Sequence, residues 1–210
     1  MLVKKAVNPR EPDHMIIQQA VEVLTDSKLV VYPTDTLYGL AVDPRSLKAV
    51  EKLFSAKARP PNLPIPLIAS DIEQVQKFTG SLTPLAYHLA RHFWPGPLTL
   101  VIDAMPTLSK RLLGGKNSVA VRVPDHNLAR LLARNLGHPV TATSANLTGK
   151  PVPTTARDAV VDLGTSVTLV LDGGPTLNLL PSTIVDVRSE EPILIRNGVL
   201  TWDCVLESLA

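Results

Sequence analysis

The sequence predicts an α/β protein, a single domain in which a twisted β-sheet of mixed direction has flanking helices. Segments with the apolar pattern of strands take turns along the chain with segments that repeat apolar residues at helical spacing. Several of the connections between them are short, and this combination favours a mixed sheet covered by helices. A chain of 210 residues, 45% of them hydrophobic, is also long enough to enclose one full core.

Helices are predicted where a capping residue precedes apolar residues at helical spacing. Ser46, Thr83 and Thr155 are such residues, and each caps the helix that follows it. Ser70-Asp71-Ile72-Glu73 has the spacing of a capping box in which Ser70 is the cap. The expected helices span residues 15–25, 46–54, 70–78, 83–92, 127–136 and 155–163, and a last one begins at Trp202.

Strands are predicted where β-branched and other apolar residues run between turn signals. Residues 119–123 and 140–143 flank the helix at 127–136, so these three segments form one strand–helix–strand unit. The expected strands span residues 29–32, 67–69, 98–102, 119–123, 140–143, 167–171, 183–187 and 193–195.

Composition restricts the classes of protein that remain. No apolar run approaches the roughly 20 residues of a membrane span, and the first residues lack a signal peptide's apolar stretch, so we expect a cytoplasmic protein without a membrane partner. Cys204 is the single cysteine, which excludes an internal disulfide, and we expect it in the last helix. The net charge of +2 is too small to indicate a nucleic-acid binder by itself.

A ligand site is predicted where the strand at 140–143 leaves the sheet. Ser144 and Asn146, separated by one alanine, offer a hydroxyl and an amide at a position where ligands bind in open α/β sheets. A turn cap is the alternative interpretation of these two residues.

Basic residues near other strand ends indicate a locally positive cavity. Arg122 interrupts the apolar alternation of its strand, and a buried guanidinium must meet a carboxylate, a phosphate or solvent. Lys57 and Arg59 would point to the same side of an extended segment, so both could reach one polyphosphate. Solvated surface charge remains the alternative for the basic residues Lys110, Arg111, Lys116 and Lys150.

Seven motifs occur in a fixed order along nearly the whole chain. They are Tyr32-Pro-Thr-Asp-Thr-Leu-Tyr-Gly39, Lys57-x-Arg59-Pro60, Trp94-Pro-Gly-Pro-Leu-Thr99, Val119-Ala-Val-Arg-Val-Pro124, Ser144-Ala-Asn146, Pro181-Ser-Thr183 and Ile195-Arg-Asn-Gly198. In this order the set resembles the TsaC/YrdC family, the L-threonylcarbamoyladenylate synthases. The resemblance implies a YrdC-like fold around a large, open, positively charged cavity, with one domain over residues 1–210 and no C-terminal extension domain.

The reaction implied by the resemblance condenses L-threonine, bicarbonate or CO2, and ATP to threonylcarbamoyl-AMP and pyrophosphate, for tRNA threonylcarbamoyladenosine formation. ATP is then a substrate that carries Mg2+ with it, and no metal bound by protein side chains is expected. The implied partners are tRNA or double-stranded RNA, and the protein complex that transfers the threonylcarbamoyl group to tRNA. Two alternatives stay open: a non-catalytic RNA-binding module of YrdC-like fold, and an adenylating enzyme for a different carbamate.

The resemblance also implies roles for individual residues. Lys57 and Arg59 match catalytic positions, and Tyr32 and Thr34 complete the cavity wall. The residues implied to bind ATP are Arg59, Asn62, Ser118, Ser144, Asn146 and Arg196. The residues implied to bind threonine are Thr36, Ser70, Arg122, Ala142 and Ser182. The sequence departs from the family in one place, because the loop at 60–66 is about two residues longer than in many relatives and Ser70 stands where they carry a histidine.

Overall fold

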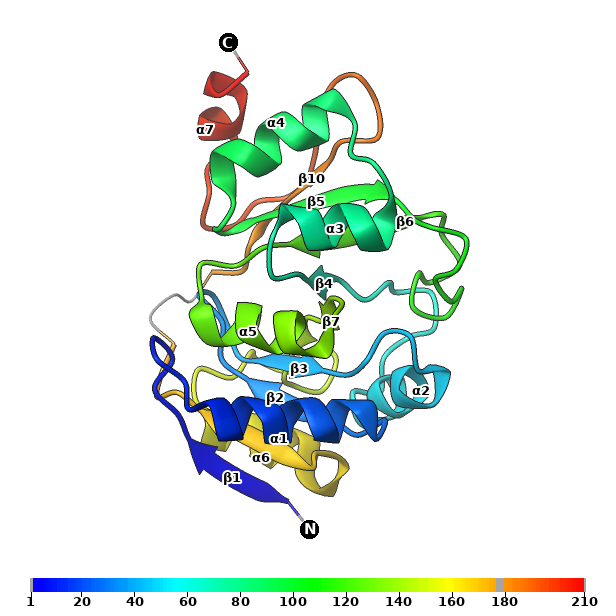
Figure 1. The fold of residues 1–210 in the computed structure, drawn as a ribbon. Coiled ribbons are helices and arrows are strands. Elements are labelled where there is room, and N and C mark those ends of the chain that lie inside the picture. The colour runs from blue at the N-terminus through cyan, green and yellow to red at the C-terminus, as the bar shows by residue number, and fades with distance from the viewer. Residues whose placement is uncertain (1, 177–179, 210) are drawn as a thin grey trace.

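The computed structural model describes residues 2–176 and 180–209, and it divides the strands between two sheets instead of the single sheet expected (Figure 1). The first sheet has the strand order β1-β9-β2-β3-β8, and the second has the order β11-β10-β5-β6-β4-β7. Each contains parallel and antiparallel pairs, so the predicted mixed direction is confirmed. The strands are β1 (Val3–Ala6), β2 (Val30–Tyr32), β3 (Gly39–Ala41), β4 (Leu67–Ile68), β5 (Leu98–Asp103), β6 (Ser118–Arg122), β7 (Val140–Thr141), β8 (Thr143–Ser144), β9 (Leu169–Asp172), β10 (Thr183–Asp186) and β11 (Ile193–Arg196).

All of the expected helices form, and most begin at the residue that the sequence indicates. Ser46, Thr83 and Thr155 each accept a hydrogen bond from a backbone N–H in the first turn, as predicted. In the described part of the chain, none of the helices combines the length and the apolar character of a membrane span. The helices are α1 (His14–Thr25), α2 (Leu47–Ala56), α3 (Ile72–Thr79), α4 (Pro84–Phe93), α5 (Asn127–Leu136), α6 (Ala156–Leu163) and α7 (Trp202–Glu207), with a short 3-10 turn at Gly164–Ser166.

Two further details of the fold prediction are wrong. The cap of α3 is Asp71, whose carboxylate accepts the N–H of Gln74, while Ser70 donates its hydroxyl to that same carboxylate. A carboxylate next to a helix N-terminus gains from the helix dipole, which favours Asp71 over the serine. The expected strand at 140–143 is divided, because β7 pairs with β4 in the second sheet and β8 pairs with β3 in the first.

The first sheet is covered on both faces. Helices α1 and α5 lie side by side over one face (Figure 1), and their apolar residues pack with Val30 and Tyr32 of β2. Val31, the residue between these two, belongs to the other core cluster together with apolar residues of α6. Adjacent side chains of a strand point to opposite faces, so β2 is buried on both.

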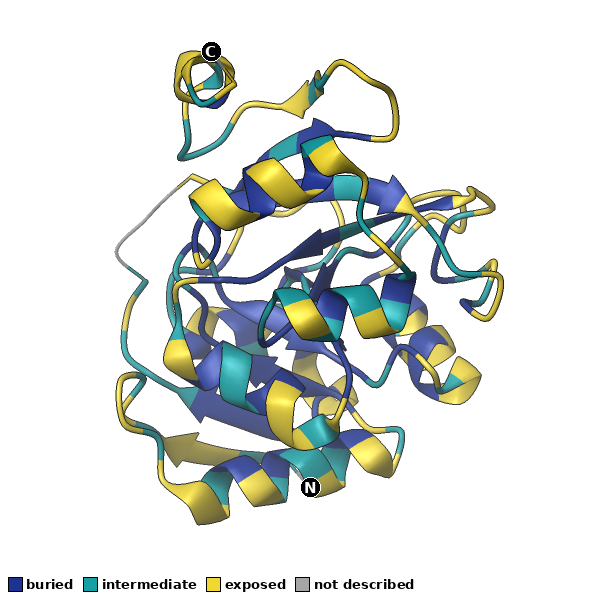
Figure 2. Cartoon of the chain, turned by 45° about the horizontal axis from the view of Figure 1, so that its top comes forward, coloured by how far each residue is buried: buried dark blue, intermediate teal, exposed yellow. Residues whose placement is uncertain are grey.

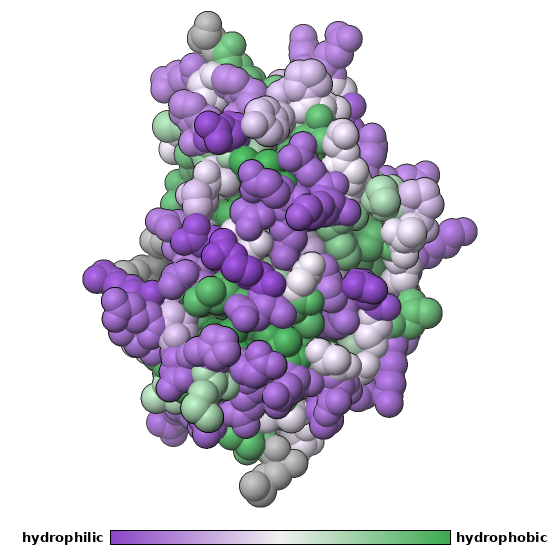
Figure 3. Space-filling view, viewed as in Figure 1, coloured by the Kyte–Doolittle hydropathy of each residue, from purple (hydrophilic) through white to green (hydrophobic). Residues whose placement is uncertain are grey.

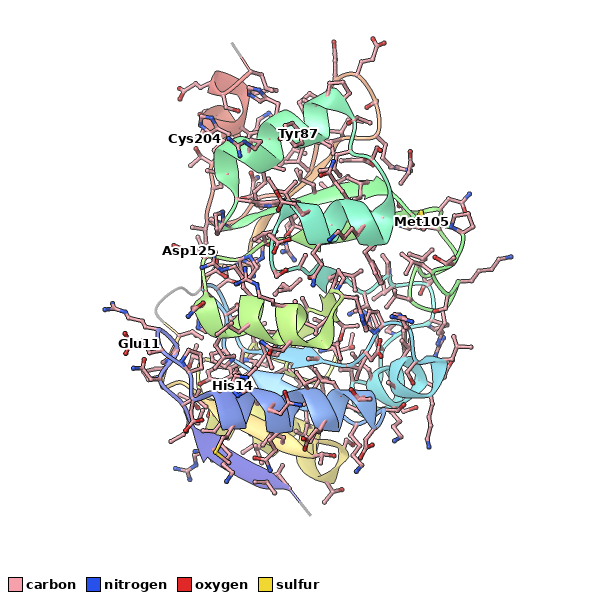
Figure 4. All side chains as sticks on the ribbon, in the orientation of Figure 1. Glu11, His14, Tyr87, Met105, Asp125 and Cys204 are labelled. Atoms are coloured by element: carbon pink, nitrogen blue, oxygen red, sulfur yellow. The ribbon has the colours of Figure 1, made fainter. Side chains whose placement is uncertain are left out.

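The second sheet is covered by helices on one face. Helices α3 and α4 lie in front of β5 and β6 in Figure 1, and α7 packs beside α4 at the end of the molecule where Figure 4 labels Tyr87 and Cys204. Cys204 lies in α7 as expected, and its side chain is exposed. Figure 2 shows buried strands between helices whose outer sides are exposed, and Figure 3 shows that the outer surface of these helices is mostly hydrophilic. Among residues 2–176 and 180–209, no helix covers the opposite face of this sheet, and this face forms the candidate site.

Candidate functional site

A cavity of about 540 Å3 lies between the two sheets. Tyr32, Gly39 and Ser144 line it from the first sheet, and alternate residues of β5, β6 and β10 line it from the second. Because strand side chains alternate between faces, these second-sheet residues form one floor, and their neighbours pack in the core on the other side. The floor residues are Thr99, Val101, Ser118, Ala120, Arg122, Ile184 and Asp186.

Next to the first sheet, the cavity wall is a turn at residues 34–37 that is stabilised by hydrogen bonds within the turn. The Thr34 hydroxyl accepts the N–H groups of Thr36 and Leu37 and donates to the Leu37 carbonyl. Behind it, the Tyr32 hydroxyl donates to the carbonyl of Thr141 at 3.1 Å, and burial raises the pKa of Tyr32 far above its ordinary value, so the phenol stays neutral. Gly39 lies against this ring, because a Cβ at Gly39 would come within 3.0 Å of it. The wall is therefore held in place by polar bonds and close packing.

Arg122 is a buried charge, and of the three partners expected for it, a carboxylate, a phosphate or solvent, it meets a carboxylate. Its NH1 group donates to Asp35 at 2.6 Å, and its NH2 group donates to the Thr36 hydroxyl at 3.3 Å. The guanidinium thus joins the floor of the cavity to the turn of the opposite wall.

A second polar chain crosses the floor at the end of β11. The guanidinium of Arg196 donates to the carbonyl and the hydroxyl of Ser182, and that hydroxyl shares a 2.7 Å hydrogen bond with Thr99. Gly198 fixes this arrangement, because a Cβ there would come within 2.3 Å of the Pro181 carbonyl oxygen. Partial burial, and then the charge of Arg122, lower the pKa of Arg196. Ser182 and Arg196 therefore form one unit beside Arg122.

Arg59 lines the cavity next to the loop at 60–66. Its Nε donates to the carbonyl of Leu63 and its NH2 group donates to the carbonyl of Pro64, so the longer loop at 60–66 supports the guanidinium. Burial lowers the pKa of Arg59, but an arginine remains charged at any physiological pH.

Lys57 does not extend alongside Arg59, so the prediction that both side chains leave an extended segment on one side is wrong. Lys57 ends α2 in a helical conformation, and Ala58 has a φ of 47°, so the backbone reverses between the two residues. The Lys57 side chain is buried and absent from the cavity lining. Its ammonium donates to the carbonyls of Ser144 and Asn146, each at 2.5 Å. Lys57 therefore holds the Ser144–Asn146 segment, which the sequence predicts to be a ligand site.

The remaining predicted residues divide into two groups. Ser118, Ala142 and Ser144 line the cavity. Asn62 is exposed outside its lining, Ser70 is buried against Asp71, and the Asn146 amide donates to the Lys150 carbonyl. The predicted site residues that the structure gathers at the cavity are Tyr32, Thr34, Thr36, Arg59, Ser118, Arg122, Ala142, Ser144, Ser182 and Arg196, and those outside its lining are Lys57, Asn62, Ser70 and Asn146.

Six polar residues of the lining were absent from the set inferred from sequence. They are Tyr38, Thr99, Lys116, Thr143, Asp186 and Arg188. Asp186 accepts both Nε and NH2 of Arg188, which lowers the pKa of the carboxyl despite the opposing effect of burial. Tyr38 donates to the Gly174 carbonyl at 2.6 Å, and burial raises its pKa to about 12. Asp186 had a signal that could have been used, since it shares its strand face with Ser182 and Ile184.

Comparison with known proteins shows which protein family this chain belongs to. A family model for Sua5, YciO and YrdC, described as "Telomere recombination", matches residues 22–198. The chain belongs to the Sua5/YciO/YrdC family. It is 40% identical to the threonylcarbamoyl-AMP synthase of Bacillus subtilis (strain 168), over 88% of this chain and 54% of that protein. It is 38% identical to the threonylcarbamoyl-AMP synthase of Vibrio vulnificus, over 87% of this chain and 98% of that one.

A solved structure supports the same membership in the Sua5/YciO/YrdC family. Sua5 of Pyrococcus abyssi, crystallised in complex with L-threonine, superposes with a TM-score of 0.93 and 33% sequence identity, over 99% of this chain and 61% of that one. The chain thus spans little more than half of its relatives from B. subtilis and P. abyssi and nearly all of its V. vulnificus relative. The predicted α/β fold and the family resemblance are confirmed.

Proposed function

We propose that the chain is an L-threonylcarbamoyladenylate synthase, a nucleotidyltransferase that joins L-threonine, bicarbonate or CO2, and ATP, and releases pyrophosphate. The relatives that carry this name support the proposal. The observation that carries it is the charge of the cavity. Its described lining contains the basic residues Arg59, Lys116, Arg122, Arg188 and Arg196 but a single carboxylate, Asp186, which is already paired with Arg188.

This distribution of charge suits the chemistry. An anionic N-carboxythreonine must attack an α-phosphate that is itself negative, so fixed cations and hydrogen-bond donors lower the barrier more than a strong base would. We assign the α-carboxylate of threonine to Arg122, with Thr36 and Ser182 beside it. Arg59, Arg196, Ser118 and Ser144 face the nucleotide, and Mg2+ enters as part of the ATP substrate.

Lys57 has a different role in this proposal from the one expected for it. Its ammonium is held by backbone carbonyls of the Ser144–Asn146 segment and lies outside the cavity lining, so it positions Ser144 instead of touching phosphate. Asn146 supports the same segment through its bond to the Lys150 carbonyl. The product would pass to the protein complex that modifies tRNA, and we expect this to take place in the cytoplasm.

A pyrophosphate-release assay with each substrate omitted in turn tests the proposal. We expect release only when L-threonine, bicarbonate, ATP and Mg2+ are all present. Equal release without threonine would instead identify an enzyme that adenylates another carbamate. Absence of release from any mixture, together with retention of double-stranded RNA, would identify a binding module.

The position of Lys57 also predicts a pH dependence of ATP binding. Burial, and then the charge of Arg59, lower the pKa of Lys57 to about 8. Above that pH the amine loses its charge and one of its three N–H groups, so its bonds to the Ser144 and Asn146 carbonyls weaken and the Ser144 segment should loosen. We expect the Kd for ATP to rise about tenfold between pH 7.5 and 9.5, roughly the effect of losing one hydrogen bond to a charged group. Calorimetric titration of ATP into the protein measures this Kd. Threonine and bicarbonate are absent from the experiment, so changes in their protonation with pH do not affect the result.

The sign of the linkage separates this local effect from unfolding. The folded pKa of Lys57, about 8, is below its ordinary value of 10.5, so between these pH values the unfolded chain holds the extra proton. This group therefore makes the folded state more stable as the pH rises through that window. Weaker ATP binding at pH 9 with an undiminished Tm would support the assignment. A constant Kd up to pH 9.5 would contradict it.

A further inference from the structure

Asp35 makes the most buried ion pair of the described residues. Its carboxylate accepts NH1 of Arg122 at 2.6 Å, and the two side chains are only 14% and 7% exposed. Asp35 follows β2 of the first sheet, whereas Arg122 is the last residue of β6 in the second. The pair therefore spans the space between the sheets at one end of the cavity.

The second carboxylate oxygen of Asp35 fixes its position relative to the second sheet. It accepts the backbone N–H of Asp125 at 3.2 Å, in the connection that leads from β6 into α5 (Figure 4). The two oxygens thus hold both the side chain of Arg122 and the backbone that follows it. A carboxylate bonded at two points has little freedom to rotate, so it fixes the direction of the guanidinium it binds.

Arg122 is held at a second point by the residue next to Asp35. Its NH2 group donates to the Thr36 hydroxyl, and Thr36 is itself fixed through the bond from its N–H to Thr34. The guanidinium is planar, so two bonds from adjacent residues of one turn fix its plane. The Arg122 side chain lines the cavity in this orientation.

Charge gives Asp35 a second effect. Arg122 and Arg196 are close enough for the charge of Arg122 to lower the pKa of Arg196. Without a carboxylate, a buried Arg122 would be repelled by Arg196 and would have no compensation for the loss of its contact with water. The Asp35 carboxylate compensates the charge of Arg122. The affinity of this end of the cavity for an anion then depends on the direction in which the N–H groups of Arg122 point.

We propose that Asp35 is the positioning residue for the carboxylate-binding arginine: it holds Arg122 in the one orientation that accepts the α-carboxylate of threonine. This inference rests on the proposed function, because it takes threonine as the ligand of Arg122. It predicts that loss of the Asp35 charge affects threonine and leaves ATP unaffected.

The test replaces Asp35 with asparagine, which keeps the size of the side chain and one acceptor oxygen but removes its charge. We expect the KM for threonine to rise about tenfold or more, the range for a lost hydrogen bond to a charged group, and the KM for ATP to change less than about twofold. Calorimetric titration of L-threonine into Asp35→Asn should show the same loss of affinity in the absence of turnover.

Asp43→Asn is the matched control. Asp43 also forms a buried pair, with His138 at 2.8 Å, but it lies outside the cavity lining. Both variants should lower the Tm, and only Asp35→Asn should change the KM for threonine. A wild-type protein without threonine-dependent release would overturn the proposed function and this inference with it. A threonine-dependent wild type with an unchanged KM for threonine in Asp35→Asn would overturn this inference alone.

Discussion

Replacing Arg59 with lysine should lower kcat about 100- to 1,000-fold, the cost of losing one preorganised donor from a transition state. Arginine offers two parallel N–H groups to a phosphate, and lysine keeps the charge but loses this fork. The structure adds a second reason, since Arg59 is supported by the carbonyls of Leu63 and Pro64, and an ammonium that made both bonds would have a single N–H left for a phosphate. Steady-state kinetics of pyrophosphate release measures the effect.

Ser144→Ala provides the comparison, because it removes a neutral hydroxyl from the same site. We expect a loss of roughly tenfold, seen mostly as a higher KM for ATP, since a neutral hydrogen bond contributes about 0.5–1.5 kcal/mol. Both variants should remain folded. If Arg59→Lys keeps near wild-type turnover while its Tm falls, Arg59 has only a structural role and the phosphates bind elsewhere.

Replacing Gly198 with alanine should reduce turnover about 100-fold, although Gly198 has no side chain to touch a substrate. An added Cβ would lie 2.3 Å from the Pro181 carbonyl oxygen and 2.4 Å from the Thr183 nitrogen, both backbone atoms that cannot rotate away. The Ser182 segment and Arg196 must therefore separate, and a displacement of about 1 Å at a site can cost 100-fold. The free energy of unfolding should fall by about 1–3 kcal/mol, as for other overpacked sites.

Gly137→Ala controls for the loss of stability. Gly137 ends α5 with a φ of 83° and has nothing within 4 Å of an added Cβ, so alanine there is strained but meets no clash. We expect Gly137→Ala to lose about 1 kcal/mol of stability and to keep wild-type turnover. Full activity in Gly198→Ala would show that Arg196 and Ser182 need not stay together.

Local chemistry explains why much of the fold was predictable. Ser46, Thr83 and Thr155 cap helices because their hydroxyls satisfy N–H groups that lie next to them in the sequence. The need of Arg122 for a partner was also predictable, because a charge within an apolar strand cannot stay unpaired. The identity of that partner was not, since Asp35 lies 87 residues away and is brought near only by tertiary structure.

The wrong predictions concern features that leave little local signal. The turn at Ala58 has a positive φ, which the sequence does not announce because alanine rarely adopts it. The division between β7 and β8 depends on pairing with β4 and β3, which lie about 70 and 100 residues earlier in the chain. Sequence reasoning therefore found most of the polar residues of the lining, and it placed Lys57 among them although this residue supports the lining from behind.

The passage of the chain from one sheet to the other at Ala142 restricts how the cavity can open. Thr141 pairs with Leu67 in the second sheet, Thr143 pairs with Leu40 in the first, and the N–H of Ala142 between them is bonded to the Pro66 carbonyl. A single bonded residue cannot act as a hinge, so the two sheets cannot swing apart there without breaking strand pairs. At Ala142 the two sheets are therefore held at a set separation, and the width of the cavity between them depends on it.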